Sequence, residues 1–281
     1  MTIKKSFAAL VFLISLCSLM SFINLSSVGI QNTKAAPFDE DQTNSFSCAN
    51  PKNDEERVTC AEIEAQILAS TVHIELLTWE SSSEEQKLLS NESHATILGD
   101  SYLVTHNHFK YSLTNQVEAY GEESGYVAIS LRETSGRLLL YGPLNSFTIV
   151  HQDAESLILS FVDWNGQGLF EAANLPSAKF ADTNSISLKE GDELAQIDWD
   201  GATTHVDWVH VVDVIQAENV PQIRVDNFPL EGCSGGGVFL DGVHIGNNWM
   251  RNMKMNQATG EITSRYSTVA LNSAMIMEMG K

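Results

Sequence analysis

Residues 231–239 read EGCSGGGVF, a stretch that sets one serine, Ser234, among glycines and continues at once into apolar residues. Glycine tolerates positive φ and lets another backbone approach closely, so this pattern predicts a tight turn leading into a buried strand. Such a turn exposes the serine hydroxyl and can aim successive backbone N–H groups into one concavity, as an oxyanion requires. A glycine-rich turn alone is more often structural than catalytic. A catalytic interpretation therefore needs a partner elsewhere in the chain.

The partner is a histidine motif far upstream, YLVTHNHF at residues 102–109. A serine becomes a nucleophile only when a base takes its proton and hydrogen-bond donors stabilise the resulting charge. Together the two stretches resemble the nucleophile and histidine motifs of the trypsin/chymotrypsin-like serine proteases. That family's motif reads Thr-Ala-Ala-His, which places the base at His108. His106 and Asn107 replace the two alanines, so His106 stays an alternative.

The resemblance implies an all-β, chymotrypsin-like fold of two antiparallel six-stranded β-barrels with the active site between them. It implies that Ser234 is the nucleophile, that His108 is the general base, and that the N–H groups of Gly232 and Ser234 form the oxyanion hole. The expected reaction is hydrolysis of protein or peptide substrates through an acyl-enzyme, without metal or cofactor. Trp249 stands where the family's return strand lines the cleft, and is expected to contact substrate. Phe228, six residues before the serine, argues against a pocket for Arg or Lys.

The acid that orients His108 is expected just before the apolar run at residues 157–161. The family's Asp-apolar-x-apolar-apolar pattern places it at Glu155, whereas a bulge before Leu157 would bring Asp153 into that place. Residues two apart share a strand face, so both carboxylates can face the histidine. The shorter aspartate side chain favours Asp153, with Glu155 as the alternative. An incomplete acid motif would instead indicate an inactive protease homologue that acts as a binding protein.

The chain has four cysteines, Cys17, Cys48, Cys60 and Cys233. Cys48 and Cys60 bracket a short polar segment and are expected to form a local disulfide in an oxidising compartment. Cys233 would then be a free thiol directly before the serine, where the family's animal digestive enzymes carry an aspartate. A cysteine nucleophile is an alternative, but at this place it would point away from the base.

Metal chemistry is the remaining alternative. The cysteine spacings fit no zinc pattern, and no metal site is expected. His106 and His108, at positions i and i+2, keep a metallohydrolase open, although no other cluster with metal-ligand spacing accompanies them.

The composition is that of a globular protein: 281 residues, 43% hydrophobic and 19% charged. The net charge of −20 argues against nucleic acid or an anionic membrane surface as a partner. Lys4 and Lys5 precede an apolar run, which predicts a signal peptide over residues 1–36 and a secreted or periplasmic protein. If uncleaved, that run would be a single membrane anchor. No pattern indicates an oligomeric state.

The expected organisation has three parts after the signal peptide. A lead-in or propeptide covers residues 37–65, an N-terminal barrel 66–164, and a C-terminal barrel with a terminal helix 165–281. Short alternating runs between Gly, Asn and Asp turns predict the strands, beginning with residues 71–77. Apolar spacing predicts helices within residues 61–68 and 271–279. Ser82 and Glu85 form a possible capping box, which predicts a short helix or ordered loop over residues 82–89.

Overall fold

The structure is a computed structural model that describes residues 46–81, 86–110, 127–163, 165–181, 186–215, 221–257 and 259–279. All of them belong to one compact unit, Glu40–Lys281. The expected signal peptide, residues 1–36, lies outside the described residues. Within the described ranges, no helix combines the length and the apolar character needed to cross a membrane.

The first element of the described residues is helix α2, Asp54–Ala69, which begins seven residues before the expected helix at residue 61. Its N-cap is Asn53, whose side chain accepts a hydrogen bond from the Glu56 N–H at 2.9 Å. The acidic first turn also suits the positive end of the helix dipole. At the other end of the helix, Ile67 is buried and packs with Phe239 of the C-terminal barrel.

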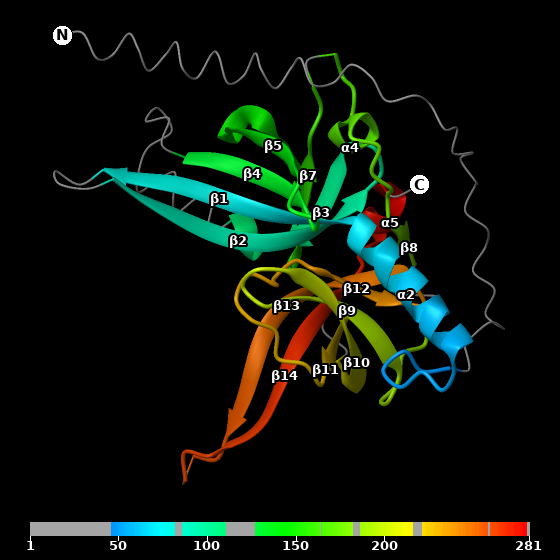
Figure 1. The fold of residues 1–281 in the computed structure, drawn as a ribbon. Helices are drawn as coiled ribbons and strands as arrows, with labels where there is room; N and C mark the ends of the chain where they lie inside the picture. Colours follow the sequence, from blue (N-terminus) through cyan, green and yellow to red (C-terminus); the bar gives the residue numbers. More distant parts are fainter. Residues whose placement is uncertain are drawn as a thin grey trace, which may run out of the picture. The chain divides into compact units, whose positions relative to one another are not determined.

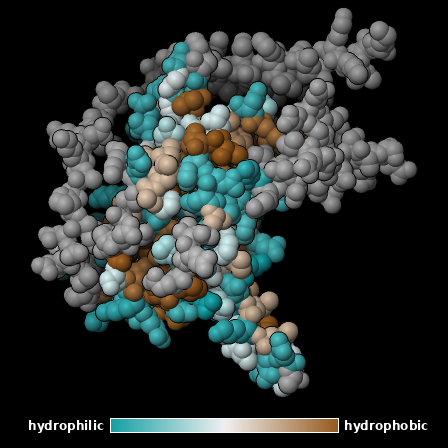
Figure 2. Space-filling model, turned by 180° about the vertical axis from the view of Figure 1, so that it is seen from behind, coloured by the Kyte–Doolittle hydropathy of each residue, from teal (hydrophilic) through white to brown (hydrophobic). Residues whose placement is uncertain are grey.

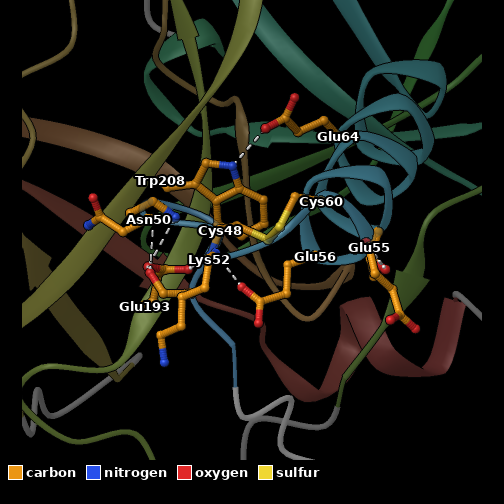
Figure 3. Close-up of a disulfide and its surroundings, with 12 residues drawn as sticks. Cys48, Asn50, Lys52, Glu55, Glu56, Cys60, Glu64, Glu193 and Trp208 are labelled. Carbon is orange, nitrogen blue, oxygen red and sulfur yellow. Dashed lines mark hydrogen bonds between the residues drawn. A yellow bond between two sulfur atoms is a disulfide. The ribbon is translucent and has the colours of Figure 1, made fainter.

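The segment before α2 is tied to the rest of the molecule. The expected disulfide is present and joins Cys48 to Cys60, within α2. The backbone N–H of Cys48 donates to a carboxylate oxygen of Glu193 at 2.6 Å (Figure 3). Further along the helix, the Trp208 indole N–H donates to Glu64 at 2.7 Å. The part of the lead-in that the structure describes is therefore docked on the C-terminal barrel.

The N-terminal sheet has seven strands in the order β5-β4-β1-β2-β3-β7-β6, with antiparallel neighbours (Figure 1). The strands are β1 Thr71–Ser81, β2 Gln86–Leu98, β3 Tyr102–His106, β4 Val127–Glu133, β5 Leu138–Pro143, β6 Thr148–Gln152 and β7 Ser156–Ser160. A 3-10 turn, Leu144–Ser146, follows β5. Alternate residues of β1, such as Val72, Ile74 and Leu76, enter the core because successive side chains point to opposite faces. The sheet curves into a half-barrel.

The C-terminal sheet also has seven strands, in the order β12-β9-β10-β11-β14-β13-β8. They are β8 Lys179–Phe180, β9 Glu193–Trp199, β10 Thr204–Ile215, β11 Gln222–Val225, β12 Gly237–Leu240, β13 Val243–Met255 and β14 Ile262–Leu271. Strand β12 pairs with both β9 and β13, which closes six strands into a barrel. Strand β8 adds to β13 in parallel.

In the described part of the chain, two short helices remain: α4, Leu169–Ala172, follows β7 in the sequence, and α5, Ala274–Met279, follows β14. The terminal helix is confirmed, although Leu271 ends β14 instead of beginning the helix. A closed six-stranded barrel beside a half-barrel confirms the expected chymotrypsin-like fold.

The β13–β14 hairpin extends beyond the barrel (Figure 1). In the space-filling view, this projection mixes hydrophilic and hydrophobic residues (Figure 2), and the exposed side chains of the two strands include Met253 and Met255.

Candidate active site

The predicted tight turn around Ser234 is present and lies directly before β12. Gly232 and Gly235 both have positive φ, 101° and 81°. A side chain at Gly235 would also collide with the Thr105 hydroxyl and the His94 carbonyl oxygen. Glycine is therefore required at Gly235 on two grounds, its left-handed backbone and the close approach of the N-terminal sheet.

Strand β2 of the N-terminal sheet holds this turn through hydrogen bonds. The carbonyl oxygen of Ser234 accepts from the His94 N–H at 3.0 Å and from the Ser93 hydroxyl at 2.7 Å. The His94 ring nitrogen Nδ1 lies 2.8 Å from the Gly232 carbonyl oxygen, and Nε2 lies 2.8 Å from the Thr204 hydroxyl. Burial lowers the pKa of His94 to about 4, so the ring is neutral at physiological pH. Because a carbonyl oxygen only accepts, Nδ1 carries the proton and Nε2 accepts.

A small pocket of about 20 Å³ lies beside Ser234, a volume about that of one water molecule. Its lining residues are Pro229, Leu230, Cys233, Ser234, Asn248, Trp249, Met250, Arg251 and Ser267. Trp249, the expected substrate contact, is among them. Phe228 is not; its ring packs against the guanidinium groups of Arg251 and Arg265, with centroid distances of 5.3 and 5.7 Å.

The two candidate histidines have different surroundings. His106 ends β3, is 7% exposed, and has its pKa lowered to about 3 by burial and by the neighbouring His108. His108 lies in the helical turn that follows, and its side chain is only partly buried. Burial lowers the pKa of His108, and its ring lies 5.7 Å from the Trp249 ring, centroid to centroid. Through Trp249, His108 adjoins the residues that line the pocket.

The candidate acids lie at the turn between β6 and β7. One carboxylate oxygen of Asp153 accepts the N–H groups of Glu155 and Ser156, at 3.0 and 2.7 Å, and the other lies 3.7 Å from His151 Nε2. The Glu155 carbonyl oxygen accepts the Asn107 N–H at 2.8 Å. Burial, together with Asp153, raises the pKa of Glu155. One carboxylate oxygen of Glu155 accepts from the Gln222 side-chain amide at 3.3 Å, so it is the backbone of this turn that contacts the segment carrying His108.

The structure does not join these groups into a hydrogen-bonded chain. Among the described residues, no hydrogen bond links His108 to Ser234, Asp153 or Glu155. Catalytic hydrogen bonds are often long without substrate and tighten when it binds, so this geometry excludes none of the assignments. The catalytic roles therefore stay predictions.

Sequence reasoning missed a buried polar cluster beneath the turn. Asp198, at the end of β9, accepts hydrogen bonds from the Cys233 thiol at 2.9 Å and from the Asn227 amide at 3.1 Å. Ligand atoms of Asp198, His205 and Asp207 lie within 4.8 Å of one another, a spacing that can hold a metal ion. Asn227 donates to both carboxylates, which accounts for their proximity without an ion. A single aspartate in the alternating strand ELAQIDW was the only sequence signal of this cluster.

Comparisons with known proteins identify structures of similar fold. No family model and no curated protein matches the chain. Among solved structures, it is similar to a serine-to-alanine variant of the HtrA-type protease AlgW with a decapeptide, at 16% identity and a TM-score of 0.52 over 78% of this chain and 64% of that one. It is also similar to Deg5, at 17% identity and a TM-score of 0.51 over 71% of this chain and 88% of that one.

These neighbours confirm the trypsin-like serine protease fold that the sequence motifs predict. Within that fold class, the chain is similar to an HtrA-type protease and to Deg5. It spans about 64% of the length of AlgW. At these identities the likeness shows the fold alone.

Proposed function

We propose that this protein is an exported serine endopeptidase in which Ser234 is the nucleophile and His108 the general base. The turn at residues 232–236 carries the proposal. Gly232 and Gly235 have the positive φ that the turn requires, β2 holds it from one side, and a pocket opens beside the serine. The similarity to an HtrA-type protease with a decapeptide supports protein or peptide substrates. The Cys48–Cys60 disulfide supports an oxidising compartment outside the cytoplasm.

The proposed reaction proceeds through an acyl-enzyme. His108 takes the Ser234 hydroxyl proton as the serine oxygen attacks the scissile carbonyl carbon. The N–H groups of Gly232 and Ser234 stabilise the oxyanion, and His108 then passes the proton to the leaving amine. Water releases the acyl group by the same steps. Trp249, between His108 and the pocket, is proposed to contact the substrate.

Asp153 is the predicted orienting acid, and Glu155 is its alternative. The Asp153 carboxylate accepts hydrogen bonds from backbone N–H groups of its own turn. The backbone carbonyl of Glu155 accepts a hydrogen bond from Asn107, the neighbour of His108. The Glu155 carboxylate accepts from Gln222, so these contacts do not rank the two acids. Neither carboxylate bonds to His108 in the described residues, so mutagenesis has to decide.

A fluorophosphonate probe tests the nucleophile directly, because it reacts only with an activated serine. We expect the wild type to be labelled and Ser234→Ala to be unlabelled. Ser234→Ala and His108→Ala should each lower kcat by about 10⁴ to 10⁶, and the double variant hardly further, since the pair acts as a unit. His106→Gln is the matched control and should keep most activity. Loss in His106→Gln with activity in His108→Ala would move the base to His106.

One observation favours a second candidate function. In the described residues no acid is hydrogen-bonded to His108, as expected of an inactive homologue that binds peptides without cutting them. Peptide binding without fluorophosphonate labelling would establish that alternative. A cysteine nucleophile has no such support, because burial and Asp198 raise the pKa of Cys233, and its thiol donates to Asp198.

A further inference from the structure

The residue before the nucleophile has an unexpected partner. Cys233 is free, 1% exposed, and its thiol donates a hydrogen bond to a carboxylate oxygen of Asp198 at 2.9 Å. Burial and the nearby carboxylate raise the pKa of the thiol, so it keeps its proton and stays a donor. A side chain of the nucleophile turn is thus anchored to strand β9.

Asp198 is itself fixed firmly enough to act as an anchor. The side chain is 8% exposed, and the same oxygen that receives the thiol also accepts the Trp199 N–H at 2.7 Å. Its other oxygen accepts the Asn227 amide at 3.1 Å. Burial alone would raise the pKa of Asp198, but the bonds from Cys233, Asn227 and Trp199 outweigh it and lower the pKa. A charged acceptor makes these hydrogen bonds stronger than neutral ones.

The backbone of the turn is fixed from a second side by Asn248 of β13. The Gly235 N–H donates to the Asn248 carbonyl oxygen at 2.7 Å, and the Asn248 N–H donates to the Gly236 carbonyl oxygen at 2.8 Å. The Asn248 side chain also reaches the Cys233 carbonyl oxygen at 3.4 Å. The two backbone bonds hold the residues after Ser234, whereas Cys233, before it, is held by the Asn248 side chain at its carbonyl and by Asp198 at its thiol.

We propose that Asp198 is a positioning residue for Ser234, acting through the Cys233 thiol. The amide N–H of Ser234 belongs to the peptide that Cys233 begins, so the orientation of Cys233 sets the direction of that donor. An oxyanion hole stabilises the transition state only when its donors are already aligned. The inference rests on the proposed function for its effect on rate, but the mechanical link between Asp198 and the turn can be measured without it.

The test compares Asp198→Ala, Cys233→Ala and Cys233→Ser with the control Asp213→Ala, which removes an exposed carboxylate paired with Arg224 on the same barrel. Two quantities are measured, peptide hydrolysis and amide hydrogen exchange of residues 233–236. We expect Asp198→Ala and Cys233→Ala each to lower kcat by about 10- to 100-fold with KM changed less than about threefold, because an aligned donor acts mainly in the transition state. Cys233→Ser supplies a hydroxyl donor and should recover kcat to within about threefold of the wild type.

Exchange of the Gly235 and Gly236 amides should speed up by about tenfold or more in both alanine variants and stay unchanged in Asp213→Ala. The double variant Asp198→Ala/Cys233→Ala should have about the same kcat as Asp198→Ala alone, because both substitutions remove the same thiol–carboxylate hydrogen bond. Unchanged exchange and kcat in a folded Cys233→Ala overturns the proposal, even if Asp198→Ala fails to fold. An inactive wild type would contradict the proposed function. The hydrogen-exchange result would still show whether the Asp198–Cys233 contact positions the turn.

Discussion

At the scale of single residues, the structure distinguishes the two candidate histidines by their exposure, which the sequence does not show. His106 and His108 lie two positions apart, yet His106 is enclosed at the end of β3 and His108 lies beyond it beside Trp249. A general base must exchange protons with substrate, which requires access. The motif predicts His108 as the base, and its greater exposure is consistent with that proposal.

The first prediction concerns the pH dependence of activity. Burial lowers the pKa of His108 from its ordinary value of 6.5, and the proposed base works only when neutral. We therefore expect kcat/KM to rise with pH and to reach half its maximum below pH 6.5. A pH–rate profile with a small peptide substrate measures this, and the ascending limb should disappear in His108→Ala. A midpoint well above 6.5 would show that a carboxylate pairs with His108 in the free enzyme.

The second prediction concerns the orienting acid. If Asp153 holds the histidine tautomer, Asp153→Asn should lower kcat by about 10⁴ while the protein stays folded, and Glu155→Gln should cost far less. Steady-state kinetics of the two isosteric variants, with circular dichroism to confirm folding, separates the roles. The reverse ranking assigns the role to Glu155, and two mild effects would favour the binding protein.

At the scale of elements, alternation in the sequence predicted most strands, because one face of each strand packs into a barrel core. It misjudged the segment after residue 77. The capping box Ser82–Glu85 suggested a short helix or ordered loop over residues 82–89; residues 82–85 lie outside the described residues, and from Gln86 onward the chain is strand β2, paired with β1 in one long antiparallel ladder. Pairing over eleven residue positions between β1 and β2 outweighs any local helical preference of residues 86–89.

The arrangement of the elements also explains why the sequence did not predict the buried polar cluster around Asp198. Asp198 occupies one position of a regular strand, and its partners Asn227 and Cys233 lie in distant turns. No spacing rule connects them, because the barrel closure that brings them together is a property of the fold. The nucleophile turn was predictable because its chemistry lies within a few consecutive residues.

The third prediction concerns the disulfide that ties the segment before α2 to the helix. Replacing Cys48 and Cys60 by serine should reduce the free energy of unfolding by about 2–4 kcal/mol, chiefly because the unfolded chain loses a constraint. Thermal unfolding with and without reductant measures this: the wild type should shift on reduction, and the double variant should not. Cys233→Ser is the control and should respond to reductant as the wild type does. A wild-type Tm that does not change when the Cys48–Cys60 disulfide is fully reduced would contradict the prediction.

At the scale of the whole molecule, the core holds histidines that burial keeps neutral. Burial lowers the pKa of His94 to about 4, and that of His106 and His244 to about 3. In the unfolded chain a histidine takes up a proton near pH 6.5. Between these values the unfolded state binds more protons than the folded state does. Stability must therefore rise with pH through this window and be lost as the pH falls.

The fourth prediction follows from that linkage. The free energy of unfolding in urea should fall as the pH is lowered from 6.5 towards 4, by at most about 1.4 kcal/mol per pH unit for each buried histidine. His244→Gln, which cannot titrate, should show a shallower dependence than the wild type between these pH values. An identical slope in the variant would place the titration on other groups.

Strand β12 has a consequence for how the chain folds. It is only four residues long, it follows the Ser234 turn directly, and its two partners, β9 and β13, are the strands that carry Asp198 and Asn248. The pairing of β12 with β9 and β13 closes the barrel, and the turn before β12 contacts both of these strands, through Asp198 and Asn248. We therefore expect a chain in which β12 is unpaired to lack these contacts of the turn. If Ser234 is the nucleophile, as proposed, activity on refolding should therefore appear no earlier than the pairing of β12 with both strands.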